Sequence, residues 1–141
     1  MRRAGVITLA VVVASCTVSV PDDAISVLDA REMIVEHNGA SATIHGWLGE
    51  CYSLDCPIYS SEVFARAGSA DDWETEEWQT ARDHSLLLYV DSDFQSIASW
   101  MEFDEVVVQG KLDASCRAPE GETMCFDGAD FRPDTIEKVI F

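Results

Sequence analysis

The sequence predicts a small, mainly β domain, folded as a barrel with one or two short helices. Residues 41–49 alternate apolar and polar side chains, residues 85–90 form a continuous apolar run, and residues 106–112 are rich in valine. These patterns are typical of short strands. Gly46 and Gly110 lie within two of the strands, where a glycine allows a bend or a close backbone approach. Several short strands in a chain of 141 residues favour a small barrel.

Capping residues predict the helices. Asp29 is followed three positions later by an acidic residue, which resembles a capping box and predicts a helix over residues 29–37 that ends at Asn38-Gly39. The polar run of residues 91–93 turns the chain and could cap a second short helix that extends to Met101.

The remaining segments carry weaker patterns. A short strand could begin at Ile58, and residues 60–70 are ambiguous, with a turn of helix as one option. Residues 71–77 hold five carboxylates in seven positions, which indicates a solvated loop or a frayed helix. Near the end of the chain, Pro133-Asp134 is expected to open a turn.

The first residues have the pattern of an export signal. Arg2 and Arg3 precede an apolar run over residues 4–14, which is shorter than the roughly 20 residues needed to span a bilayer. The run ends at Val13-Ala14-Ser15-Cys16, which resembles the lipobox of bacterial lipoproteins. The commonest lipobox begins with Leu and has Gly or Ala before the cysteine, so the match is imperfect. An ordinary secretory signal cut near Ser15 or Ser19 is the alternative.

The lipobox resemblance implies an anchor and an address. Cleavage before Cys16 would leave its thiol to carry a diacylglycerol and its amine to carry a further acyl chain, and two or more chains give stable anchoring. Thr17 follows the cysteine where an aspartate would resemble an inner-membrane retention signal, which favours the outer membrane facing the periplasm. The expected organisation is a signal peptide at 1–15, a lipidated cysteine and tether at 16–27, and one barrel domain at 28–141.

The charge of the expected mature chain excludes one class of partner. Removing residues 1–15 takes away 2 of the 9 basic residues and none of the 26 acidic ones, so 7 − 26 gives a side-chain charge of −19. Nucleic acid is held by clustered Lys and Arg, so we expect no nucleic-acid partner. Anionic headgroups would also repel the domain, so the lipid itself must anchor it.

Four cysteines remain after Cys16, and an even count in an exported domain indicates two disulfides. Local pairing, Cys51 with Cys56 and Cys116 with Cys125, is favoured, and a crossed pairing such as Cys51 with Cys116 stays open. Structural zinc is less favoured, because four and eight residues separate the cysteines within the two pairs and zinc sites usually have two to four. No metal and no cofactor is expected.

The strands that contain Gly46 and Gly110 resemble strands of OB-fold domains, in which a glycine lets a strand bend around the barrel. The resemblance covers about residues 40–117 and its motifs are not specific. It implies an OB-like barrel, a fold that often binds oligonucleotides or oligosaccharides on one face. The chain is also similar to small OB-fold-like lipoproteins of Gram-negative bacteria, and that likeness implies no activity.

Aromatic residues supply the candidate binding site. Trp73 and Trp78 lie five positions apart in the acidic stretch, where exposed indoles would suit a cationic or glycan partner. The alternative is that one or both fold back onto the core. Trp47 and Trp100 are expected in the barrel wall. The acidic residues of 71–77 lack the spacing of a calcium loop, so a solvated charge run is the better interpretation.

Catalytic motifs are not found. The three histidines are separate in sequence, and the chain has no nucleophile elbow, phosphate-binding loop or dinucleotide motif. The leading hypothesis is a non-enzymatic envelope binding or accessory module on a lipid anchor, with an envelope protein or a glycan as its partner. The alternative is a small envelope hydrolase that uses acidic residues and one histidine, and a third option is a structural protein without a ligand.

Overall fold

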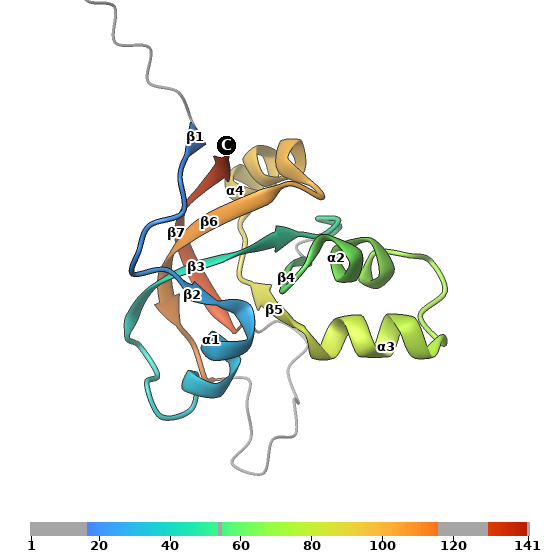
Figure 1. Ribbon diagram of the computed structural model, residues 1–141, viewed down its shortest axis with the longest axis horizontal. Coiled ribbons are helices and arrows are strands. Elements are labelled where there is room, and N and C mark those ends of the chain that lie inside the picture. Colours follow the sequence, from blue (N-terminus) through green and yellow to red (C-terminus); the bar gives the residue numbers. More distant parts are fainter. Residues whose placement is uncertain (1–16, 54, 116–129, 141) are drawn as a thin grey trace, which may run out of the picture.

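A closed barrel of five strands forms the centre of the molecule (Figure 1). The computed structural model describes residues 17–53, 55–115 and 130–140. In chain order the barrel strands are β3 (Ser41–Leu48), β4 (Cys56–Tyr59), β5 (Ser85–Leu88), β6 (Glu105–Leu112) and β7 (Phe131–Val139). The three strands predicted from sequence, at 41–49, 85–90 and 106–112, are confirmed, and so is the mainly β class.

The strands close the barrel in the order β3-β4-β5-β7-β6 and back to β3. Every neighbouring pair is antiparallel except β5 and β7, which are parallel and meet at Leu88 and Phe131. β6 forms long ladders with both of its neighbours, with β3 from Ser41 opposite Lys111 to Trp47 opposite Glu105, and with β7 from Val106 to Leu112. The barrel is therefore closed by one parallel contact.

Two short strands that precede the barrel in the sequence pair with its edges. β1 (Thr17–Val18) pairs in parallel with the end of β7, and β2 (Ile25–Ser26) pairs in parallel with β3. Parts of the segment expected as a tether are thus hydrogen-bonded to the sheet. These two pairs of residues occupy free strand edges on β7 and β3.

In the described part of the chain, four short α-helices and one 3₁₀ turn connect the strands, where one or two helices were expected. They are α1 (Val27–Met33), α2 (Glu62–Gly68), α3 (Glu76–Asp83), α4 (Ser92–Ala98) and the 3₁₀ turn η1 (Ser99–Met101). α2 and α3 lie side by side between β4 and β5, and α4 with η1 leads from β5 to β6 (Figure 1). No helix in the described ranges is long and apolar enough to cross a bilayer.

Side-chain caps fix where these helices begin. Asp91 accepts a hydrogen bond from the Phe94 amide, as its position before the predicted second helix implied. The first helix begins at Val27 rather than at Asp29, because Ser26 is its cap. α3 was not predicted as a stable helix. Thr75 caps it, and two glutamates in its first turn stabilise it by interacting with the positive end of the helix dipole.

The prediction of a turn at Pro133-Asp134 is wrong, because both residues lie inside β7. Pro133 pairs with Gly110, and the register between β6 and β7 shifts between Gln109 and Gly110. A proline lacks the amide that a regular ladder needs, so a register shift opposite it is a place where a strand can hold one.

The barrel core consists of apolar side chains that alternate along the strands with more exposed residues. Its fully buried members include Ile44, Leu48, Ile58, Leu86, Leu88, Val106, Val108 and Phe131. A smaller cluster lies between the barrel and the α2–α3 pair, with Tyr59, Ala65 and Ala81 buried and Trp47 packed against them. The second cluster matters for function because it forms the base of the site described below.

Gly46 and Gly110 occupy the two tightest positions between strands. A Cβ atom at Gly46 would lie 2.6 Å from the Tyr59 carbonyl oxygen, and one at Gly110 would lie 2.1 Å from the Arg132 carbonyl oxygen. Backbone atoms cannot move aside as a flexible side chain can. The close approach expected from the two strand glycines therefore exists at both positions.

We expect Gly46→Ala and Gly110→Ala each to lower the free energy of unfolding by about 2 to 3 kcal/mol, since each methyl group would force two strands apart. Gly39→Ala is the control. Gly39 has open space around it, so its substitution should cost about 1 kcal/mol, from its positive φ of 82° alone. Chemical denaturation measures all three, and equal losses would contradict a steric role for the strand glycines.

Candidate functional site

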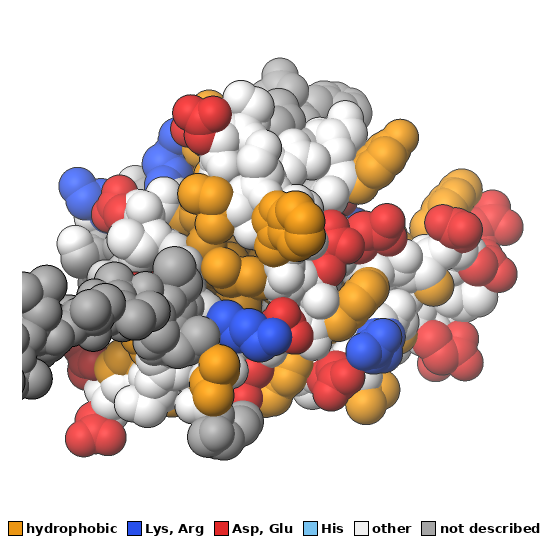
Figure 2. All heavy atoms as spheres, turned by 90° about the horizontal axis from the view of Figure 1, so that it is seen from above, with side chains coloured by type: hydrophobic (Ala, Val, Ile, Leu, Met, Phe, Trp, Pro, Cys, Tyr) orange, Lys and Arg blue, Asp and Glu red, His pale blue; other side chains and the backbone are white. Residues whose placement is uncertain are grey.

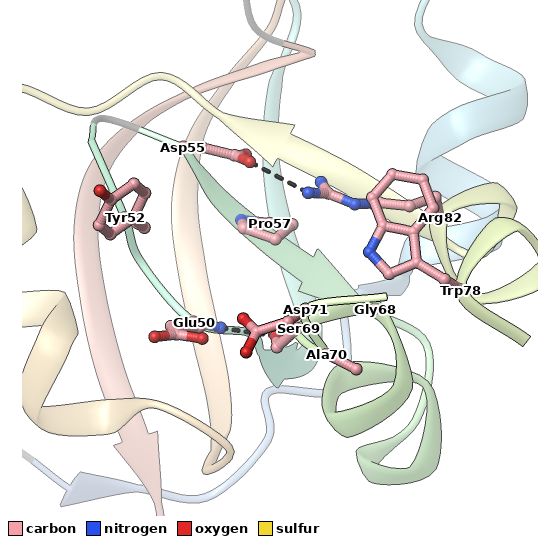
Figure 3. A pocket seen from close by; sticks show the side chains of 10 residues that line it. All are labelled: Glu50, Tyr52, Asp55, Pro57, Gly68, Ser69, Ala70, Asp71, Trp78 and Arg82. Carbon is pink, nitrogen blue, oxygen red and sulfur yellow. Dashed lines mark hydrogen bonds and ion pairs between the residues drawn. The ribbon is translucent and has the colours of Figure 1, made fainter. Parts of the chain in front are cut away.

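A hollow of about 430 Å³ lies between the loop after β3 and the α2–α3 pair (Figure 3). The loop contributes Glu50, Tyr52 and Asp55, and the helices contribute Trp78 and Arg82. In Figure 3 these side chains surround the space above Pro57, with Tyr52 on one side and Trp78 on the other. Segments that are far apart in the sequence thus meet around one space.

A disulfide between Cys51 and Cys56 shapes the loop side of the hollow. This local pair confirms one of the two predicted disulfides and rules out the crossed pairing of Cys51. Cys116 and Cys125 lie outside the described residues. Closing so short a loop contributes about 2 kcal/mol on the loop-entropy account.

Hydrogen bonds hold the loop in place on both sides. Tyr52 and Asp55 exchange two backbone hydrogen bonds of 2.8 Å across the loop. The Glu50 amide donates to the Ser69 hydroxyl at 2.9 Å, which ties the loop to the end of α2. The loop is therefore a fixed wall of the hollow, joined to the helices that form the other wall.

Arg82 is the central charged group of the site. It lies in the last turn of α3, and its Nη2 donates to the Asp55 carboxylate at 3.0 Å. Its guanidinium also lies 4.9 Å from the centre of the Trp78 ring, within the range of a cation–π contact. Trp78 is consequently half-buried and held in place by the arginine.

The Asp55–Arg82 pair has unused hydrogen-bonding capacity. Asp55 Oδ1 and Arg82 Nε are both buried atoms, and neither has a hydrogen-bond partner among the described residues. Buried polar atoms usually have hydrogen-bond partners. A ligand or an ordered water could donate to the Asp55 oxygen and accept from the Arg82 nitrogen. The site can therefore bind a polar group as well as a charged one.

The lining of the hollow is acidic. Three carboxylates, those of Glu50, Asp55 and Asp71, face one arginine. The arginine is already paired with Asp55, which leaves Glu50 and Asp71 as exposed negative charges on the rim. A positively charged ligand would therefore be attracted to the hollow and an anionic one repelled.

Tyr59 forms the floor beneath the hollow. Its side chain is fully buried, and Cβ atoms built on Gly49 and Gly68 would lie 2.5 Å and 2.3 Å from its side-chain atoms. Burial raises the pKa of Tyr59 to about 12, against an opposing effect of Arg82, and the nearby Asp55 adds to the rise while the Ser69 hydroxyl opposes it. Tyr59 is consequently a neutral phenol at physiological pH.

The structure separates the two tryptophans that were predicted to share a site. Trp78 lines the hollow, whereas Trp73 does not and leaves 61% of its surface exposed. The Trp73 carbonyl accepts a hydrogen bond from the Gln79 side chain at 3.1 Å, which fixes its backbone beside α3. Trp73 therefore stands apart from Trp78 on the surface.

The other two tryptophans were both expected in the barrel wall. Trp47 lies on β3, half-buried against the Tyr59 cluster, in agreement with that expectation. For Trp100 the expectation is wrong, because the residue lies in η1 and is 88% exposed. The turn at the end of α4 directs this indole away from the core.

Sequence reasoning missed several groups of the site. Tyr52 and Asp55 could have been found, because they lie inside the predicted disulfide loop and such loops are held at the surface. Arg82 carries no local signal, since its partner Asp55 is 27 residues away. Ser69 is likewise brought to the site only by the packing of α2.

Two histidines make defined contacts away from the hollow. His45 on β3 contacts the Glu105 carboxylate on β6, and its ring lies 5.3 Å from that of Trp47. His84 stacks on Phe64 with ring centres 4.4 Å apart. Within the described ranges, no three His, Cys, Asp or Glu side chains gather as a metal site would require.

The raised pKa of Tyr59 predicts a specific pH dependence. The phenol resists ionisation in the folded chain, so its contribution to stability is complete below its ordinary pKa of 10.0 and is lost as the pH rises toward about 12. We expect the free energy of unfolding to fall more steeply between these pH values in the natural chain than in Tyr59→Phe. Denaturation at stepped alkaline pH measures this, and parallel curves would contradict it.

No protein-family model, curated protein or solved structure matches this chain.

Proposed function

We propose that this chain is a bacterial envelope lipoprotein, anchored through Cys16, whose OB-like barrel is a non-enzymatic binding module for a basic segment of a partner protein. The single observation that carries the proposal is the acidic hollow in which the only arginine among the described lining residues is already paired with Asp55. The proposal has three parts, which are the fold type, the ligand class and the anchor.

The strand order supports an OB-type barrel. Numbered along the chain, the five barrel strands are arranged 1-2-3-5-4, the third and fifth are parallel, and α4 lies between the third and fourth. OB-folds are five-stranded Greek-key barrels that bind ligands with the loop between strands 1 and 2, among others. In this chain that loop is the Cys51–Cys56 loop, which forms one wall of the hollow.

Charge and ring surfaces favour a basic ligand. A lysine or arginine side chain entering the hollow would meet the free carboxylates of Glu50 and Asp71, and the Tyr52 ring, 76% exposed, offers a face for cation–π contact. The mature side-chain charge of −19 derived above would also speed the encounter with a basic partner. A neutral glycan could stack on the same rings but would make no use of the charge.

Binding to a lysine- and arginine-rich peptide tests the ligand class. We expect the pair Glu50→Gln and Asp71→Asn to weaken binding about fivefold to tenfold at low salt, because two rim charges are lost. The matched control is Glu32→Gln with Glu36→Gln, which removes the same charge from α1 and the turn after it, outside the hollow, and should change affinity less than twofold. Calorimetry with the peptide and with a neutral chitooligosaccharide measures both.

Three outcomes would contradict the proposal that this hollow is a non-enzymatic binding site for a basic ligand. Equal weakening in both charge pairs would mean that only the overall charge attracts the peptide. Preference for the oligosaccharide would favour the glycan alternative. Cleavage of the peptide, lost in His45→Gln, would favour the alternative of a small hydrolase, for which the contact between His45 and Glu105 is the supporting observation.

Mass spectrometry of the mature protein isolated from membranes tests the anchor. The expected N-terminal residue is Cys16, with a diacylglycerol on its sulfur and an acyl chain on its amine. A chain that begins elsewhere, or an unmodified Cys16, would overturn the lipoprotein part of the proposal and leave the binding part standing. A Cys16→Ser variant is the control, and it should be released from the membrane fraction.

A further inference from the structure

A partly apolar surface lies at the end of the barrel that carries α4. Trp100 is 88% exposed there, and Ile97 and Ile140 are each 55% exposed. Residues 94–101 contain no charged side chain, in a chain with 26 acidic residues. Figure 2, seen from this end, shows hydrophobic side chains gathered near its middle, with charged side chains beside them. We call Ile97, Trp100 and Ile140 the apolar end surface.

An ion pair joins the end of β7, which precedes Ile140, to the segment that follows Trp100. Lys138, close to the end of β7, forms an ion pair of 3.0 Å with Asp104, which follows η1 closely. Ile140 lies just beyond β7, two residues after the lysine of this ion pair. The ion pair also removes a free charge from this region. The exposed isoleucine and tryptophan side chains therefore belong to a single end of the molecule.

The N-terminal segment reaches the barrel at the same end. Thr17 and Val18 pair with Lys138 and Val139, and the Ile140 amide donates to the Val18 carbonyl at 3.2 Å. Cys16 directly precedes Thr17, and adjacent Cα atoms are about 3.8 Å apart. An acyl group on Cys16 would consequently be attached within one residue of a hydrogen-bonded strand, with no free tether between them.

We propose that the apolar end surface rests on the lipid bilayer in which Cys16 is anchored. This inference builds on the proposed lipidation and adds to it a defined orientation of the domain. Tryptophan is enriched at the membrane–water interface, where an indole can bury its rings and keep its N–H hydrated. Ile97 and Ile140 would bury further apolar area beside it.

The size of the surface agrees with a membrane rather than a protein partner. Three exposed side chains offer far less than the roughly 800 Å² per partner of a stable protein interface. Such a surface is effective only when another attachment supplies a high local concentration, as a lipid anchor does. The acidic remainder of the domain would be repelled by anionic headgroups, which leaves the uncharged end as the face able to approach them.

The orientation leaves the hollow accessible. In Figure 1 α3, which carries Trp78 and Arg82, lies away from both β1 and α4. A domain seated on its apolar end surface would hold α3 away from the bilayer. The anchor and the binding site would then occupy different sides of the barrel.

Tryptophan quenching by brominated phosphatidylcholine tests the seating. The chain from Cys16 onward keeps every described helix and strand, and an N-terminal hexahistidine segment holds it on vesicles that contain a nickel-chelating lipid. We expect brominated lipid to quench the fluorescence of this protein relative to unbrominated vesicles of equal nickel content. Trp100→Ala should remove most of that quenching, whereas the control Trp73→Ala, also an exposed tryptophan, should keep it.

Two further measurements complete the test. Ile97→Asp with Ile140→Asp should lower the quenching to the level of Trp100→Ala, and the chain without its histidine segment should bind the vesicles at least about tenfold more weakly. Quenching that persists in Trp100→Ala, or that is lost in Trp73→Ala, would overturn the proposal. So would dimerisation in the absence of lipid that Trp100→Ala abolishes, because a second copy would then cover the surface.

The histidine segment makes this result independent of acylation in cells. Mass spectrometry alone decides whether Cys16 carries lipid, and the vesicle experiment alone decides whether the apolar end surface meets the bilayer. A failure of either proposal can therefore be recognised without the other.

Discussion

The barrel depends on the close contact of β3 with β4 at Gly46, where the Tyr59 carbonyl leaves no room for a Cβ atom. β3 is the strand that pairs with both β4 and β6, so its path determines where both neighbours run. The same contact sets the position of Tyr59, whose ring then fills the space between Gly49 and Gly68. Glycines on β3, on the following loop and on α2 thus bring the two walls of the hollow to a common floor.

Asp55 and Arg82, the paired charges that line the hollow, are placed so that a ligand can compete for them. Asp55 and Arg82 remain 45% and 28% exposed, and pairs exposed to this extent contribute only about 0 to 1 kcal/mol to stability. An incoming cation could therefore take over part of the interaction of Asp55 at small cost to the fold. Arg82 would keep its contact with the Trp78 ring, and its buried Nε would remain as a donor. The hollow combines a rigid wall with a pair of charges that can exchange partners.

Local patterns in the sequence were sufficient for the strands but not for the features that depend on distant contacts. The alternation around Ile44 and the apolar run around Leu86 identify strands because a buried face imposes those patterns. The acidic run before Trp78 concealed α3, although Thr75 and the following glutamates form a good helix start. Pro133 wrongly predicted a turn. It fits inside β7 only because the register with β6 shifts at Gly110, and a contact with another strand cannot be read from the local sequence. The pairing of Asp55 with Arg82 is likewise set by tertiary packing, which no local spacing reveals.

The division of charge over the surface connects the anchor with the binding site. Residues 94–101 are uncharged beside the strand that follows Cys16, whereas Glu50, Asp55 and Asp71 surround the hollow. Repulsion between acidic side chains and an anionic bilayer acts over about one Debye length, roughly 8 Å at physiological ionic strength. Within that distance the acidic sides of the barrel are driven outward while the uncharged end is not. For a domain anchored as we propose, electrostatic repulsion and the burial of Trp100 would therefore favour the same orientation, in which the acidic hollow would be presented to partners that approach the membrane.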